Sequence, residues 1–160
     1  MNAKFIVTGL LTSLLNLILH AAIFFLFLKD FFAAFPSGSE EFRRQLHKGT
    51  NDMVLWALLL SALALGYFIT LMIRWSRAQT WRAGLRDGLL VGVLYWGGMN
   101  FGLYASVNNF SLAGTLMDLV CSALCMAISA SFAAWMLGRS RPAASAPAAS
   151  PSAASQPASV

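Results

Sequence analysis

The chain has 160 residues, of which 58% are hydrophobic and 11% charged, and its formal net charge is +5. Such a composition excludes an ordinary water-soluble domain and indicates a protein dissolved in lipid. The basic residues stand at the ends of apolar segments rather than in one run, so we expect an anionic lipid surface, and no nucleic acid, as their partner.

Long windows without charge predict where the chain crosses the bilayer. A helix needs about 20 apolar residues to cross the hydrocarbon core, and a crossing segment must pair its own backbone groups. The windows, divided at turn-forming residues, predict four transmembrane helices, which cover residues 5–28, 53–73, 86–106 and 113–137. The expected fold is an all-α integral membrane four-helix bundle within residues 1–141. Because no cleavage-site pattern follows the first apolar run, we expect that span to be retained.

The segment between the first two spans, residues 29–52, is the largest part expected outside the lipid. Ser39 followed by two glutamates, with Phe42 and Leu46 on one side, predicts a short amphipathic helix on the outer surface. A solvated connector, kept wet by its charges, remains the alternative.

Glycines recur along the predicted third helix. Gly84, Gly88 and Gly92 are spaced by four residues, and Gly98 with Gly102 continues the small-residue spacing. Inside lipid the hydrophobic effect does not drive helices together, so close backbone approach at small residues becomes a main attraction. We therefore expect these five glycines to be helix-packing positions and the third helix to be central. A homodimer seam or a ligand channel remains the alternative.

Polar residues form a stripe on the first helix. Thr8, Thr12, Asn16 and His20 are spaced by four residues, which places them on one slowly rotating face. Polar groups are costly against lipid, so we expect this stripe to face protein.

A second polar feature is a set of residues on three predicted helices that we expect at a similar depth in the membrane. His20, Asn100 and Asp118 are all expected in the outer half of the bundle. An imidazole beside a carboxylate would satisfy an ionisable group inside the membrane, and the same pair could handle protons. The alternative is that the two side chains only satisfy each other's hydrogen-bonding groups and have no role in proton transfer. The candidate polar cluster comprises His20, Asn100, Tyr104, Asn108, Asn109 and Asp118.

Cys121 and Cys125 lie one helical turn apart near Asp118, and with His20 they would offer metal ligands. Buried cysteines more often act as small apolar packing residues. No phosphate-binding loop, nucleophile elbow or zinc-protease pattern occurs in the sequence. We therefore expect no metal, no cofactor, no catalytic residue and no enzymatic activity.

The distribution of lysine and arginine predicts the topology. Seven basic residues fall on one side of the predicted spans and four on the other, and the positive-inside rule then places both termini in the cytoplasm. Residues 142–160 are almost wholly alanine, serine and proline, so they predict a disordered tail.

The segment GLLVGVLYWGGMNFGLYASVNNFSLAGTLMDLV combines a glycine-rich helix, Tyr104, an asparagine hairpin at Asn108 and Asn109, and Asp118 early in the next helix. In this pattern the chain resembles small bacterial four-span inner-membrane proteins catalogued as domains of unknown function. The resemblance implies the four-helix layout and supplies no mechanism.

We expect a structural or partner-binding role in the inner membrane, with lipid, a second copy or another membrane protein as partner. The alternative is a transporter or channel for protons or small solutes, which would use His20 and Asp118.

Overall fold

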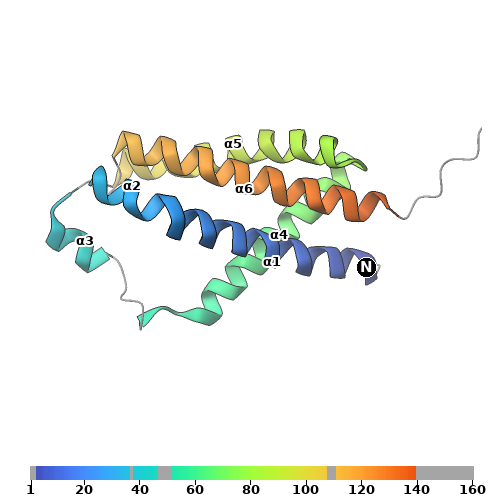
Figure 1. Ribbon diagram of the computed structural model, residues 1–160, viewed down its shortest axis with the longest axis horizontal. Helices are drawn as coiled ribbons and strands as arrows, with labels where there is room; N and C mark the ends of the chain where they lie inside the picture. Colours follow the sequence, from blue (N-terminus) through green and yellow to red (C-terminus); the bar gives the residue numbers. More distant parts are fainter. Residues whose placement is uncertain (1–2, 37, 47–51, 108–110, 140–160) are drawn as a thin grey trace, which may run out of the picture.

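The computed structural model describes residues 3–36, 38–46, 52–107 and 111–139, and all regular structure in these ranges is helical (Figure 1). This confirms the all-α class for the part of the chain described. In chain order the elements are α1 (Ala3–Ile23), the π-helical turn η1 (Phe24–Leu28), α2 (Lys29–Ala34), α3 (Glu40–Leu46), α4 (Leu55–Ser76), α5 (Trp81–Ser106) and α6 (Leu112–Gly138). Asn108, Asn109 and the predicted disordered tail at residues 142–160 lie outside these ranges.

The first helix is longer than predicted. α1, η1 and α2 follow one another without a break, so the helical segment ends at Ala34 rather than at residue 28. Lys29 and Asp30 suggested the earlier end, but exposed charges do not stop a helix. The helix ends at Phe35, whose φ of −119° and ψ of 62° are not helical, because the following Pro36 disfavours helical geometry in the residue before it.

Side-chain caps explain where three other helices begin. Thr80 accepts a hydrogen bond from the Ala83 amide at 3.2 Å, so α5 begins at Trp81, five residues before the predicted start. Ser111 accepts from the Gly114 amide at 3.0 Å at the start of α6. Ser39 accepts from the Phe42 amide at 3.2 Å, and the short helix predicted there forms as α3.

Within the described part of the chain, three helical segments are long and apolar enough to span a membrane: Ala3–Ala34, Leu55–Ser76 and Leu112–Gly138. α5 does not meet the same criterion, although it was predicted as the third of four spans. Its arginines near the start, its glycines and Asn100 lower its average hydropathy. Length and composition therefore support three of the four predicted crossings.

The helices do not form four parallel rods. α5 and α6 lie side by side as an antiparallel hairpin, α1 runs along α6, and α4 crosses α1 obliquely (Figure 1). α4 is buried only in its C-terminal half, at Gly66, Ile69, Thr70 and Ile73. Its N-terminal half projects away from the other helices, and Trp56 there is 71% exposed.

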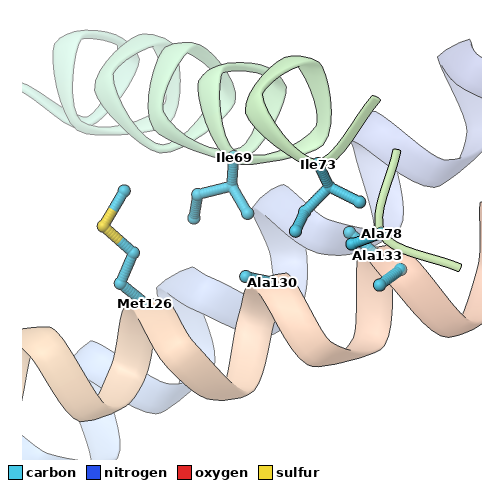
Figure 2. Packing of buried hydrophobic residues seen from close by; sticks show 7 residues of the cluster. Ile69, Ile73, Ala78, Met126, Ala130 and Ala133 are labelled. Atoms are coloured by element: carbon cyan, nitrogen blue, oxygen red, sulfur yellow. The ribbon is translucent and has the colours of Figure 1, made fainter. Parts of the chain in front are cut away.

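The hydrophobic core lies where α4 crosses α6. Ile69 and Ile73 of α4 point at Met126, Ala130 and Ala133 of α6, and Ala78 from the α4–α5 turn completes the cluster (Figure 2). Because alanine side chains are small, the larger isoleucine side chains of α4 can pack close to the backbone of α6.

Glycines bring α5 and α6 into backbone contact over the first half of α5. A methyl group at Gly84 would lie 2.6 Å from the Ala130 carbonyl oxygen, one at Gly88 would overlap Ala130 Cβ, and one at Gly92 would lie 3.0 Å from Ala123 Cα. Gly84 and Gly88 therefore require glycine, and a side chain at Gly92 would need the neighbouring α6 backbone to move by a few tenths of an ångström.

Gly98 and Gly102 do not share this role, because a methyl group at either position meets no atom within 4 Å. Gly98 follows Gly92 by six residues, which turns it about 240° around the helix axis. The expectation that the glycine face continues to the outer end of α5 is corrected here.

We predict that Gly88→Ala lowers the free energy of unfolding by about 1–3 kcal/mol, because the added methyl overpacks the α5–α6 contact. Gly102→Ala is the matched control and should leave stability unchanged or raise it by up to about 1 kcal/mol, since alanine favours a helix. Denaturant titration in detergent, followed by circular dichroism, measures both. Equal losses in the two variants would contradict the packing described.

Candidate functional site

Buried hydroxyl-bearing side chains stand beside the hydrophobic core, while much of the surface is apolar. Five side chains without any exposed surface are hydroxyl-bearing: Thr8, Thr12, Thr70, Thr115 and Ser129. Large apolar side chains lie outside, and Leu26 and Leu94 expose 81% and 68% of their surface. A water-soluble protein shows the reverse arrangement, whereas lipid accepts apolar groups outside and forces polar groups to find partners inside.

The predicted polar stripe of α1 does face protein. Thr8, Thr12 and Asn16 are buried, which confirms that expectation, and His20 is half-buried. Asn16 accepts a buried hydrogen bond through Oδ1 from the Ser129 hydroxyl of α6, at 3.1 Å. This bond joins α1 to α6 near the middle of both helices.

A second contact holds α1 against α4. Ser13 Oγ lies 2.8 Å from the Gly9 carbonyl of its own helix and 3.3 Å from the Leu63 carbonyl of α4. A methyl group at Gly66 of α4 would overlap Ser13, so glycine is needed where the two helices cross. α1 is thus tied to both of its neighbours by small polar residues.

Asn100 and Asp118 are brought together. The Asn100 amide nitrogen Nδ2, on α5, donates to Asp118 Oδ2, on α6, at 2.7 Å. Asn100 is 4% exposed, and Asp118 is half-buried. A short hydrogen bond to a carboxylate is stronger than one between neutral groups, so this contact stabilises both an otherwise unpaired acid and the helical hairpin.

His20 does not pair with Asp118. Its Nδ1 lies 3.0 Å from the Asn16 carbonyl oxygen, and because a carbonyl only accepts, the proton belongs on Nδ1 in this arrangement. Its ring instead lies beside Trp96 of α5, with centroids 5.9 Å apart. Similar depth fixes the height of a side chain but not its direction around the helix, which is why the expected imidazole–carboxylate pair is not formed.

Four buried polar atoms have no partner within the described part of the chain: Thr8 Oγ1, Thr12 Oγ1, His20 Nε2 and Trp96 Nε1. Three of them lie along the predicted stripe of α1. His20 Nε2 accepts and Trp96 Nε1 donates when the imidazole is neutral, so a single water between them would satisfy both.

The remaining predicted site residues lie elsewhere. Tyr104 is 43% exposed and joins no part of the cluster in the contacts described. Asn108 and Asn109 lie outside the described residues. Cys121 and Cys125 are buried free thiols, and among the residues described no three His, Cys, Asp or Glu side chains gather as a metal site would require.

Two residues of this interior were not singled out as site residues. Trp96 lies four residues after Gly92 and four before Asn100, so the spacing of the buried face of α5 would have located it. Ser129 lies one helical turn after Cys125 on α6. The sequence does not single out either residue, because an indole or a hydroxyl in an apolar helix carries no specific chemical signature.

Comparison of the chain with protein-family models, with curated proteins and with solved structures finds no match. The resemblance to four-span inner-membrane proteins stays a prediction.

We predict that Asn100→Leu destabilises the protein by about 1–2 kcal/mol, because it leaves the half-buried Asp118 carboxylate without its donor. Combining Asn100→Leu with Asp118→Leu should cost less than the sum of the single changes, by about 1–2 kcal/mol. His20→Leu with Asp118→Leu is the control pair and should be additive, since the two side chains share no hydrogen bond. Unfolding in detergent measures the stabilities of the single and double variants of both pairs. A coupling energy found between His20 and Asp118, and not between Asn100 and Asp118, would overturn the assignment of Asn100 as the partner of Asp118.

Proposed function

We propose that this chain is a multi-pass protein of the bacterial inner membrane, with four crossings and both termini in the cytoplasm, and that it binds another membrane helix rather than catalysing a reaction. Its apolar surface and the polar side chains buried inside it support insertion into lipid. The start of α1 and the end of α6 lie at the same end of the molecule, where Lys4 Nζ donates to the Leu137 carbonyl at 2.9 Å. An even number of crossings is consistent with that arrangement.

The basic residues support the orientation. Six of those described belong to the end of the molecule that holds the start of α1, the α4–α5 turn and the end of α6: Lys4, Arg74, Arg77, Arg82, Arg86 and Arg139. The positive-inside rule assigns that end to the cytoplasm. The low hydropathy of α5 is compatible with a crossing, because Gly84, Gly88, Gly92 and Asn100 are buried rather than turned to lipid.

The observation that carries the proposed binding role is the exposed glycine step on α5, formed by Gly98 and Gly102. Both glycines are exposed, and a methyl group at either would meet nothing inside this chain. Glycine weakens a helix by about 0.5–1 kcal/mol relative to alanine, so two unpacked glycines four residues apart are unfavourable unless something else approaches there. Glycines at this spacing let two membrane helices approach closely. A helix of a second copy or of another membrane protein fits this step.

We predict that single cysteines at position 98 or 102 crosslink to a partner in native membranes, in a background where Cys121 and Cys125 are replaced by alanine. Leu89→Cys and Val93→Cys are the matched controls, because both positions are exposed on the same helix but lie about 140–180° around its axis from Gly98. In the Gly98→Cys variant, Gly102→Leu should abolish the crosslink and leave the unfolding midpoint near that of the unmodified chain. Crosslinking at 98 and 102 no stronger than at 89 and 93 would refute the proposal. The mass of the product separates a second copy from another protein.

A transport role is the second candidate, and the unpartnered atoms along α1 favour it. Thr8, Thr12 and His20 cover about 18 Å of helix at about 1.5 Å per residue, and each carries a buried polar atom that has no hydrogen-bond partner among the described residues. Buried polar atoms ordinarily bind ordered water, so this row could hold a narrow file of water molecules.

The transport candidate predicts proton flux into vesicles that contain the purified protein, measured with an enclosed pH-sensitive dye. Thr12→Val and His20→Phe should reduce that flux to the level of protein-free vesicles, because each removes a group that would hold water. Thr70→Val is the control, since its hydroxyl already donates to the Gly66 carbonyl at 2.8 Å. Absence of flux from the unmodified protein would eliminate this candidate and leave the binding role.

A further inference from the structure

A cavity of about 270 Å³ lies at the end of the molecule where α1 begins and α4 and α6 end. Its lining includes Lys4, Phe5, Arg74, Arg77, Gln79 and Leu137. Lys4 comes from the start of α1, whereas Arg74 and Arg77 come from the end of α4 and the turn that follows it. None of the residues that line the cavity is acidic.

The chain holds this cavity in place through the α4–α5 turn. Arg77 ends α4 in the left-handed conformation, with φ 58° and ψ 22°, and directs Ala78 back into the hydrophobic core. A methyl group at Gly138 would overlap the Gln79 carbonyl, so the end of α6 lies directly against the turn. The cavity wall is therefore part of the packed structure.

The arginines in the cavity lack carboxylate partners. Within the part of the chain described, neither Arg74 nor Arg77 forms an ion pair or a hydrogen bond with an acid. Arg74 lies over the Phe5 ring, 5.4 Å from its centroid, which orients the guanidinium and leaves its N–H groups available. Asp87, the nearest acid along the sequence, pairs with Arg86 at 3.1 Å instead. Clustered guanidinium groups without a counter-ion favour binding of an anion.

The backbone conformation of Arg77 also supports a binding role for its side chain. Glycine adopts a left-handed helix end without steric cost, whereas a residue with a Cβ is disfavoured there. An arginine at this position therefore lowers the stability of the turn relative to glycine. Strain of this kind is expected where a side chain is needed for something other than folding.

We propose that this cavity binds a phosphate group, and that the phosphate belongs to the headgroup of an anionic phospholipid. Guanidinium groups match the oxygens of a phosphate through paired hydrogen bonds. Leu137 and the edge of Phe5 give the same cavity an apolar wall, which suits the glycerol and the first acyl carbons of a lipid better than free phosphate. The inference rests on the proposed membrane insertion, but it is independent of the glycine step on α5. Basic pockets between membrane helices at the cytoplasmic surface bind such headgroups.

The test uses the full chain in a neutral detergent, titrated with phosphatidylglycerol, with phosphatidylcholine or with inorganic phosphate, and bound lipid is counted by native mass spectrometry. We expect phosphatidylglycerol to bind and phosphatidylcholine to bind weakly. Arg74→Gln and Arg77→Gly should each weaken phosphatidylglycerol binding about tenfold, as loss of a charge-assisted contact implies. Arg82→Gln is the matched control, because Arg82 lies over the Trp81 ring and does not line the cavity.

Arg77→Gly also separates binding from folding. The variant should melt at the same temperature as the unmodified chain or higher, because glycine relieves the left-handed turn, while its lipid binding falls. Displacement of phosphatidylglycerol by millimolar inorganic phosphate would overturn the lipid as the source of the phosphate group. Equal weakening by Arg82→Gln would overturn the cavity as the site. The cavity would also be overturned as the site if both cavity variants lost lipid binding only because they no longer fold. Extraction of the chain by alkaline carbonate would instead reject membrane insertion.

Discussion

The backbone contact between α5 and α6 is the constraint on which the rest of the structure depends. Each step of four residues along α5 matches a step of four backwards along α6: Gly84 lies against Ala134, Gly88 against Ala130, and Gly92 against Met126. The same register carried two steps further brings Asn100 to Asp118, where the hydrogen bond forms. The glycines therefore do more than close the gap between two helices, because they fix the register that supplies the carboxylate with its donor.

The position of α1 follows from a different kind of contact. In lipid an unpaired hydroxyl or amide is costly, and a helix with a polar stripe gains by turning that stripe towards other helices. Asn16 meets Ser129 of α6, and Ser13 lies against Gly66 of α4. α4 and α6, which meet in the hydrophobic core, are thus also joined through α1. Among the described residues, Thr8, Thr12 and His20 of the same stripe keep a buried polar atom without a partner, so direct contacts satisfy only part of the stripe.

The sequence was sufficient to predict what depends on composition and period: the helical class, the buried stripe of α1, and the short helix after Ser39. It was insufficient where direction around a helix decides the outcome. His20 and Asp118 share a depth, yet the imidazole turns to Asn16 and Trp96 while the carboxylate turns to Asn100. The cavity formed by Lys4, Arg74 and Arg77 could not be foreseen either, since it depends on how the turn after α4 folds back over the end of α6.

α5 shows why average hydropathy is a poor guide to a helix of this kind. The average counts every face equally, but lipid contacts only the outward one. Gly84, Gly88, Gly92 and Asn100 all lower the average, and all four are buried rather than exposed. The outward face carries Leu90 and Leu94, which expose 62% and 68% of their surface. Once α6 covers the polar side, the pair presents an apolar surface that neither the composition nor the length of α5 alone reveals. Under the proposed insertion the two helices would enter the bilayer as a hairpin, and the hydrogen bond between Asn100 and Asp118 would lower the cost of placing either residue there.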